Sequence, residues 1–365
     1  MKRTLAIFAL LSLPVLAGEV SVIRLPDGGM IPDLALGEDG TLHAVFGRRG
    51  GGSGGNAFYA RAERPGAAWG EAVRIDSQDG SCTLGMERGP RIALGKEGTI
   101  HALWQGRNAV CHSRSTDGGK TWSEARNLVD ADVGIDSPAI AADGKGNVWA
   151  IWIDSRQGDD PKSPTSGTLF LARSEDDGAT WSANYAARYP YEGRACACCS
   201  LEAGVNQAGR LLVAFRGALQ GFRDVYLLEG DARGEGFQSL RVSEDNWRMN
   251  ECPMDGPAVS LEKGSRKLLV AWRSRDEVYH AGSADGRRFS ERAAPAVPGG
   301  ERRYPGVAFG ASGEYFFAWV EGGEVVWELR SRSGKVSRSG RESGLPGRTR
   351  FAVLAGPDGA FFLVY

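Results

Sequence analysis

Short runs of apolar residues recur in pairs along the chain, and each pair is separated by a turn that contains glycine. The runs are only a few residues long, and the segments between the pairs are rich in glycine, serine and aspartate. Apolar residues at helical spacing over about ten positions are absent after residue 17. The pattern therefore predicts paired β-strands and an all-β chain.

The strand pairs recur roughly every 45–60 residues, at 31–46, 89–104, 137–152, 199–215, 256–272, 304–319 and 349–365. A repeat of this kind with only β-strand signals is typical of a β-propeller with four-stranded blades. Seven copies favour seven blades, or six if the last copy merges with its neighbour. The last copy supplies only two strands, so we expect the unpaired strand at residues 20–25 to complete that blade and close the ring.

The first 17 residues differ from the repeats. A basic start, Met1–Arg3, precedes an apolar run at residues 5–16 that ends in small residues at Ala17. This is the pattern of a secretory signal peptide, and the run is shorter than the roughly 20 residues that cross a bilayer. We therefore expect cleavage near Ala17, a secreted or periplasmic protein, and a single propeller domain over residues 18–365.

The charge of the chain is nearly balanced, with 44 basic and 45 acidic residues. Neither nucleic acid nor an anionic membrane surface is therefore an expected partner, and no later segment is long and apolar enough to span a membrane. The sequence identifies no protein partner. The candidate ligands are a metal ion, a small molecule or a glycan, bound on one face of the propeller.

The pattern Ser-x-Asp-x-Gly-x-Thr-Trp occurs at residues 115–122 and 174–181, and a degraded copy lies at 283–289. In such a turn the aspartate accepts hydrogen bonds from backbone N–H groups, and glycine permits a positive φ. Over nearly all of residues 18–365 the chain resembles the Asp-box, or BNR-repeat, propellers of the sialidase superfamily. We expect the box residues to shape turns rather than bind a ligand: Asp117, Trp122, Asp176, Trp181 and Asp285.

The resemblance also implies a catalytic set: an Arg-Ile-Pro motif opening blade 1, an acidic residue in the next top loop, two further arginines and a Tyr/Glu pair. Here residues 30–32 read Met-Ile-Pro, and the loop 47–56 contains no carboxylate. The segment 301–304 is a candidate remnant of the nucleophile region, although a solvated charged loop is the favoured interpretation: Glu301, Arg302, Arg303 and Tyr304. Glycoside hydrolysis needs two carboxyl groups or their substitutes, so a sialidase-type hydrolase with altered catalytic groups is one alternative function.

Four of the six cysteines occupy two short motifs: Cys196, Cys198 and Cys199 in RACACCS, and Cys252 in CPMDGP. These motifs resemble a group of secreted bacterial sialidase-like proteins. The repeat places them on consecutive blade-to-blade connections, which must emerge as neighbours on one face, here called the top. We therefore predict that the four cysteines converge, with Met254 beside them.

A sulfur-rich site of this composition favours a soft metal. Thiolate and thioether sulfurs together prefer Cu(I), whereas thiolates with nitrogen or carboxylate ligands favour Zn(II). We favour Cu(I), for metal handling or redox chemistry. Cys82 with Met86 repeats the pairing and is expected on the same face, whereas Cys111 is expected to be a small buried apolar residue.

Disulfides are the other chemistry that an even number of cysteines predicts in a secreted protein, and they do not exclude a metal site. A disulfide-stabilised, non-catalytic binding module is therefore the third candidate function. Charged residues at the ends of inner strands are candidates to bind a ligand or to orient metal ligands, with a solvated rim of ion pairs as the alternative. They are Asp154, Arg156, Arg194, Arg216, Arg223, Asp224, Asp255 and Arg273.

Overall fold

The computed structural model describes residues 18–50, 54–85, 87–157, 166–190, 194–231, 233–262, 264–345 and 350–365. The predicted signal peptide and Met86 lie outside these residues. The described part of the chain holds β-strands and three 3₁₀ turns but no α-helix: η1 (Pro26–Gly28), η2 (Lys96–Gly98) and η3 (Leu219–Gly221). None of its helical segments is long and apolar enough to cross a membrane.

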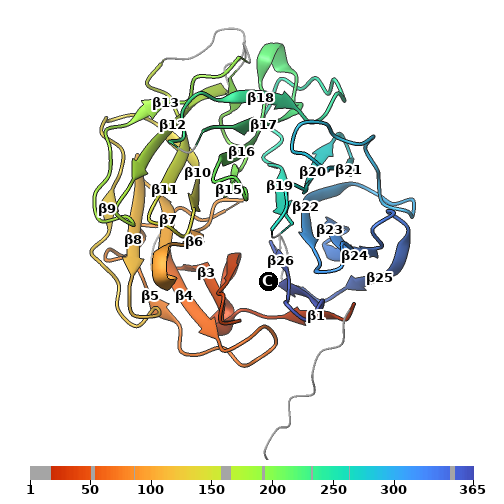
Figure 1. Cartoon of the computed structure of the whole chain (residues 1–365), viewed down its shortest axis with the longest axis horizontal. Coiled ribbons are helices and arrows are strands. Elements are labelled where there is room, and N and C mark those ends of the chain that lie inside the picture. The colour runs from red at the N-terminus through yellow and green to blue at the C-terminus, as the bar shows by residue number, and fades with distance from the viewer. Residues whose placement is uncertain are drawn as a thin grey trace, which may run out of the picture.

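Seven sheets stand around a central axis, so the fold is a seven-bladed β-propeller (Figure 1). The first four blades follow one another along the chain. Blade 1 contains β2 (Met30–Leu36), β3 (Leu42–Arg49), β4 (Gly55–Ala62) and β5 (Val73–Arg74); blade 2 contains β6 (Arg91–Leu94), β7 (Ile100–Gly106), β8 (Ala109–Ser115) and β9 (Arg126–Asn127); blade 3 contains β10 (Ile135–Ala142), β11 (Val148–Asp154), β12 (Ser166–Ser174), β13 (Tyr185–Ala186) and the added β14 (Ala195–Cys196); blade 4 contains β15 (Glu202–Val205), β16 (Leu211–Arg216), β17 (Val225–Glu229) and β18 (Gln238–Arg241).

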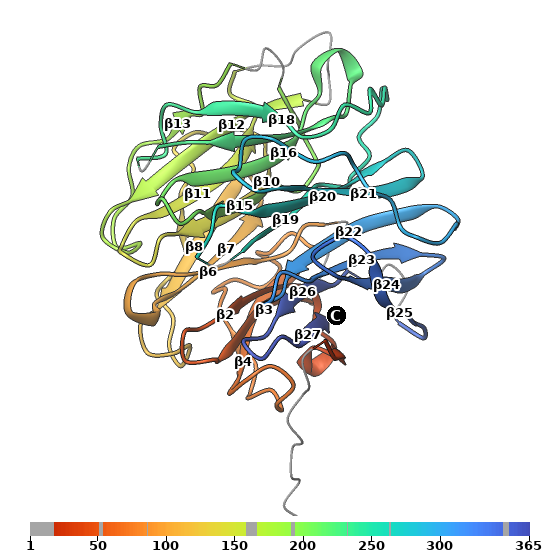
Figure 2. The ribbon, with the colours of Figure 1, turned by 45° about the vertical axis from the view of Figure 1, so that its right-hand side comes forward.

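The last three blades complete the ring. Blade 5 contains β19 (Ala258–Leu261), β20 (Leu268–Ser274) and β21 (Glu277–Ser283); blade 6 contains β22 (Arg302–Phe309), β23 (Tyr315–Glu321), β24 (Glu324–Arg330) and β25 (Val336–Glu342); blade 7 contains β26 (Ala352–Ala355), β27 (Phe361–Val364) and β1 (Val20–Ile23). The predicted ring closure is confirmed, because β1 pairs in parallel with β27 and brings the two ends of the described chain together (Figures 1 and 2).

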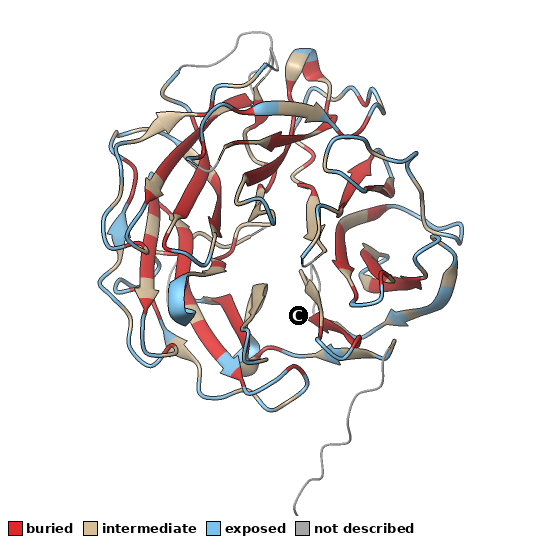
Figure 3. Cartoon of the chain, viewed as in Figure 1, coloured by how far each residue is buried: buried red, intermediate tan, exposed pale blue. Residues whose placement is uncertain are grey.

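Burial explains why the second strand of each blade is the most apolar. Each second strand packs against neighbouring blades on both faces, as Trp149 and Ile151 of β11 pack against Val213 and Phe215 of β16. Figure 3 shows buried residues along the middle of the blades and exposed residues on the outer turns. The first strands are less buried because they line the axis, and that is where a ligand can reach the fold.

Strand direction separates two faces. Consecutive strands within a blade are antiparallel, so the turns after the first and third strands lie on one face. The loops after the second strands and the connections between blades lie on the other, the top face. The Asp boxes therefore belong to the bottom face, and the cysteine motifs to the top.

Candidate functional site

Four cysteines meet at the top of blades 3 to 5. β14 pairs with the start of β12, and a turn from Cys196 to Cys199 buries both of these side chains. The Cys199 sulfur lies 3.1 Å from that of Cys196, and the Cys252 sulfur lies 3.3 Å from Cys196 and 3.7 Å from Cys199. Cys198 and Cys252 form a disulfide. The two motifs therefore face one another, as their positions in the repeat predict.

The spacing of these sulfurs is close to that of a thiolate metal site. Sulfurs around a tetrahedral ion with metal–sulfur bonds of about 2.3 Å lie about 3.8 Å apart. The sulfurs of Cys196, Cys198 and Cys252 all lie within 4.8 Å of one another. Once the disulfide is reduced, small movements would let three or four thiolates reach one ion.

The charges around the cluster favour a thiolate. The pKa of Cys196 is lowered to about 7, first because the Cys199 thiol donates a hydrogen bond to its sulfur, and then because Arg223 and Arg216 lie nearby. Burial, together with the bond it donates, raises the pKa of Cys199 well above its ordinary value. The Cys196 thiol therefore ionises more readily than an ordinary thiol, whereas the Cys199 thiol keeps its proton.

Arg216 and Arg223 tie the Cys252 connection to blade 4. The guanidinium of Arg216 is buried and donates to backbone carbonyl oxygens, among them that of Asp255 at 2.9 Å. Arg223 is also buried and donates to the carbonyl of Glu251, 3.0 Å away and directly before Cys252. These two predicted residues therefore position the cluster and bring positive charge to it.

The other predicted charged residues form hydrogen bonds and ion pairs on the top face. Asp255 is fully buried, and its carboxylate accepts the N–H of Tyr304 at 3.3 Å. Arg273 pairs with Glu301 at 2.9 Å. The remaining four form bonds that hold top-face loops: Asp154 with Arg156 (2.9 Å), Arg156 with Asp130 (2.7 Å), Arg194 with the Gln157 carbonyl (3.3 Å), and Asp224 with Arg241.

Two sulfur residues differ from the rest. Cys82 lies on the connection into blade 2, as expected, but its backbone pairs with Gly55 and its thiol lies in the apolar core beside Trp104, so it does not join the four-cysteine cluster. Cys111 packs against that same core, as expected of an apolar cysteine. The Met254 N–H donates to the Cys252 sulfur at 3.3 Å, and Met254 as a sulfur ligand stays a prediction.

The Asp boxes build turns that also join neighbouring blades. Asp176 accepts hydrogen bonds from the N–H and hydroxyl of Thr180 at 2.7 and 2.6 Å, and Asp117 is bonded to Thr121 in the same way. The tryptophans of these boxes pack against rings of the preceding blade: Trp122 on Tyr59, and Trp181 on His112. Asp285 accepts only from Ser283 and two backbone N–H groups. These contacts give the boxes a structural role.

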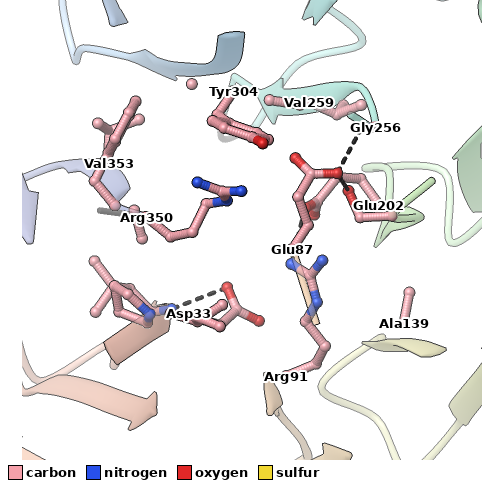
Figure 4. A pocket seen from close by; sticks show the side chains of 18 of the residues that line it. Asp33, Glu87, Arg91, Ala139, Glu202, Gly256, Val259, Tyr304, Arg350 and Val353 are labelled. Carbon is pink, nitrogen blue, oxygen red and sulfur yellow. Dashed lines mark hydrogen bonds and ion pairs between the residues drawn. The ribbon is translucent and has the colours of Figure 1, made fainter. Parts of the chain in front are cut away.

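A second candidate site lies on the axis. A cavity of about 310 Å³ is lined by the first strands of all seven blades. Figure 4 shows that its polar side chains come from different blades and point toward one another. They are Asp33 (β2), Glu87 (the connection into blade 2), Arg91 (β6), Glu202 (β15), Tyr304 (β22) and Arg350 (before β26).

The hydrogen bonds of this axial pocket fix its carboxylates. Arg91 pairs with Glu202 at 3.0 Å, and Asp33 accepts the N–H of Ile92 at 2.9 Å. Glu87 accepts the Ser200 hydroxyl at 2.8 Å and the Gly256 N–H at 2.6 Å. Ser200 directly follows Cys199, and Gly256 lies four residues after Cys252. Glu87 therefore joins the axial pocket to both cysteine-bearing connections.

Burial raises the pKa of two carboxyl groups in the pocket. The pKa of Glu202 is raised to about 7, mainly by burial and against the opposing effect of Arg91. Burial likewise raises the pKa of Asp33. A carboxyl that is half protonated near neutral pH can donate a proton to a leaving group, which is the chemistry that glycoside hydrolysis requires.

A strained turn aims Tyr304 into the pocket. β22 has a register shift between Arg303 and Gly306, and Tyr304 there has φ 54° directly before a proline. β2 and β10 carry the same bulge at Ile31 (φ 54°) and Ser137 (φ 52°). Bulges next to functional sites redirect side chains, and a non-glycine residue at positive φ is costly. The Arg350 guanidinium lies over the Tyr304 ring, 3.1 Å from the centre of the ring.

The axial pocket was missed because its residues lie one to a blade. The repeat nonetheless contains a signal. At the equivalent position of the seven first strands the chain has Asp33, Arg91, Ala139, Glu202, Ala258, Gly306 and Ala352. Four of these are alanine or glycine, so the three charged exceptions stand out once the repeats are aligned in register.

The carboxyl groups sought in loop 47–56 thus come instead from first strands and the connection into blade 2. Of the segment 301–304, Tyr304 lines the pocket, whereas Glu301 pairs with Arg303, and Arg302 pairs with Glu277 (2.9 Å) and Glu321 (2.6 Å). Those two arginines stabilise the top of blade 6. A nucleophile region over the whole segment is therefore not what the structure has.

Comparison with known proteins supports the fold assignment. No protein-family model matches the chain. A sialidase of Bacteroides fragilis (strain YCH46) is 38% identical over 93 residues, which cover 20% of this chain and only 17% of that protein. The solved Hadza microbial sialidase Hz136 superposes with a TM-score of 0.50 at 15% identity, over 92% of this chain and 65% of its own.

An α-L-arabinanase of Penicillium chrysogenum complexed with arabinobiose superposes with a TM-score of 0.54 at 15% identity, over 86% of this chain and 93% of its own. At such identities the likeness concerns the fold alone. The fold is therefore a β-propeller similar to those of this sialidase and this arabinanase, and it carries two intact Asp boxes.

Proposed function

We propose that the four-cysteine cluster binds one soft metal ion, with Cu(I) preferred over Zn(II), for metal handling or redox chemistry outside the cytoplasm. The observation that carries this proposal is the meeting of sulfurs from two separate connections, with the Cys196, Cys199 and Cys252 sulfurs 3.1–3.7 Å apart. Cu(I) is satisfied by two or three soft ligands, which this cluster offers without a nitrogen ligand.

Charge balance supports the same proposal. Three thiolates around Cu(I) leave a net charge of about −2, which is costly to bury without positive charge nearby. Arg216 and Arg223 are both buried next to the cluster. In the oxidised form the Cys198–Cys252 disulfide leaves two thiols, and its two-electron reduction by an external dithiol gives four. Metal uptake therefore depends on the redox state.

The test is a titration of reduced protein with Cu(I) against a competing chelator. Wild type should bind one ion, and Cys198→Ser combined with Cys252→Ser should weaken binding by about 100-fold or more, since two of the four thiolates are lost. Cys111→Ser is the matched control and should bind as wild type does, because Cys111 packs in a different core. Equal, weak binding in all three proteins would contradict the metal proposal and leave the cluster a disulfide-stabilised structural element.

A second function, glycoside hydrolysis, is favoured by the axial pocket. The specific observation is that Glu202, whose pKa is raised to about 7 by burial, shares one cavity with Asp33, Glu87 and Tyr304. Glu202 would donate a proton to the leaving oxygen, and a second carboxylate or Tyr304 would stabilise or attack the sugar. Release of the fluorophore from a set of fluorogenic glycosides tests this function.

In that assay Glu202→Gln should lower kcat/KM by about 100-fold, since general acid catalysis is worth 10²–10⁴ in rate. Glu229→Gln is the matched control. It removes an equally short Glu–Arg pair of the same blade, with Arg210 at 3.0 Å, but lies outside the cavity. No release from any glycoside by wild type would exclude the hydrolase and leave the metal proposal untouched.

A further inference from the structure

The charges that line the axial pocket bear on which sugar it can hold. Among the described residues the lining contains three carboxyl groups, on Asp33, Glu87 and Glu202, and two guanidinium groups, on Arg91 and Arg350. A fourth carboxyl, on Asp255, lies directly behind the wall, where the charge of Glu87 reaches it. The acidic groups in and behind the pocket wall therefore outnumber its guanidinium groups.

Both arginines are already opposed by acids. Arg91 pairs with Glu202 at 3.0 Å and also feels the charge of Asp33. Arg350 lies against the Tyr304 ring, within the electrostatic reach of Glu87 and Asp255. A carboxylate is recognised best by a guanidinium that can offer it a charge-assisted, bidentate pair. Here such a pair would require Arg91 to leave Glu202.

We propose that the axial pocket binds an uncharged sugar residue in preference to a sialic acid. This inference rests on the proposed hydrolase function and names its substrate class. The carboxylates of Asp33 and Glu87 accept hydrogen bonds from sugar hydroxyls, and Arg350 donates to them. The apolar face of the ring packs on Val259, Val353 and the Tyr304 ring, which Figure 4 places around the same space.

The size of the cavity agrees with one sugar residue. Ligand pockets usually measure about 300–1,000 Å³, and 310 Å³ lies at the small end of that range. A sialic acid brings a carboxylate and a longer side chain into the same space. Its carboxylate would meet the charge of Glu87 and would have to displace Glu202 from Arg91, and like charges brought together on binding cost affinity.

The experiment compares two probe classes on the full chain from residue 18. The neutral probes are 4-nitrophenyl α-L-arabinofuranoside and 4-nitrophenyl β-D-galactoside, and the anionic probe is 4-methylumbelliferyl N-acetylneuraminide. Wild type should act on at least one neutral probe with kcat/KM at least about tenfold above that for the sialoside. A preference for the sialoside would overturn the inference while leaving the hydrolase intact, and inactivity on every probe would overturn both.

A charge variant adds a readout that does not depend on turnover. Glu202→Gln removes the partner of Arg91, so binding of free N-acetylneuraminic acid, measured by calorimetry, should tighten by about tenfold. Glu229→Gln, which changes a Glu–Arg pair of the same length outside the pocket, should bind it as weakly as wild type does. Unchanged affinity in Glu202→Gln, with melting temperature retained, would show that the Arg91–Glu202 pair does not set the preference.

Discussion

The cysteine cluster and the axial pocket adjoin one another, yet they are assembled in opposite ways. The cluster takes all its sulfurs from two short connections, and its residues lie close in sequence within each. The pocket takes its polar side chains from the first strands of blades 1, 2, 4 and 6 and from the connections into blades 2 and 7. Chelation of a small ion needs ligands within a few ångströms, which one turn can provide. Surrounding a ligand on the axis needs the whole ring.

The surroundings of the two sites also shift the pKa values of their groups in opposite directions. Beside the cluster, the Cys199 thiol and the buried arginines Arg223 and Arg216 favour the ionised form of Cys196. In the pocket, burial favours the neutral forms of Glu202 and Asp33. A metal site needs deprotonated ligands, whereas an acid catalyst needs a retained proton. The difference therefore predicts opposite responses to pH.

The largest expected effect is that the rate of hydrolysis and the affinity for Cu(I) change with pH in opposite directions. Hydrolysis depends on protonated Glu202, whose pKa is about 7. Above pH 7 the rate should fall about tenfold per unit, to about 100-fold below its plateau at pH 9. Cu(I) affinity should change with the other sign: below the pKa of Cys196, about 7, protons compete with the metal, and affinity falls as pH falls.

Parallel measurements of kcat/KM and of Cu(I) affinity from pH 5.5 to 9 check this prediction. A pH range in which both quantities rise or both fall steeply would break the contrast between the sites. It would indicate that the two sites are coupled, and Glu87, which bonds to Ser200 and Gly256, would be the first link to examine.

A smaller effect is expected from the charge beside the cluster. Arg223→Gln removes a buried positive charge but keeps a side chain that can donate to the Glu251 carbonyl. Cu(I) affinity should weaken by about tenfold, since partners around the ligands are typically worth 10- to 100-fold, and glycoside hydrolysis should not change. Arg241→Gln, whose partner is Asp224 on the rim, is the control. Equal losses in both variants would indicate general loosening of the top face.

The sequence predicted the fold well because the fold is repetitive. The apolar pairs gave the blades, and the two-strand final copy with the extra strand at 20–25 gave the ring closure that β1 and β27 form. The boxes at Asp117 and Asp176 were recognised because all their hydrogen bonds are local. Each strand pair and each box lies within one segment of about 20 residues, and the ring closure follows from the one strand left without a partner.

The candidate sites were predictable to different degrees for the same reason. The cysteines could be brought together because consecutive connections must be neighbours. That the Cys82 thiol lies apart from the cluster could not be predicted, because the direction of its side chain depends on the pairing of its backbone with Gly55, which no local pattern shows. Asp33, Arg91 and Glu202 were overlooked because each is a single residue in a different blade. Only their shared register on the first strands unites them.

The smallest effect is expected from a substitution on the bottom face, which contains neither candidate site. Asp176→Ala removes three hydrogen bonds, from Thr180 and Ser174, and loosens a turn whose Asp177 accepts the Lys96 N–H at 2.9 Å on blade 2. Because Asp176 is largely exposed, the melting temperature should fall by only about 2–4 °C.

The bonds to Thr180 lower the pKa of Asp176 to about 2, so its stabilising contribution is complete above the unfolded value near 4 and is lost as pH falls through 2. The difference in melting temperature between wild type and variant should therefore shrink on acidification, as scanning calorimetry at pH 7 and pH 2 would show. Cu(I) affinity and hydrolysis should stay at wild-type values, and a specific loss of either at unchanged melting temperature would make the Asp box part of a site.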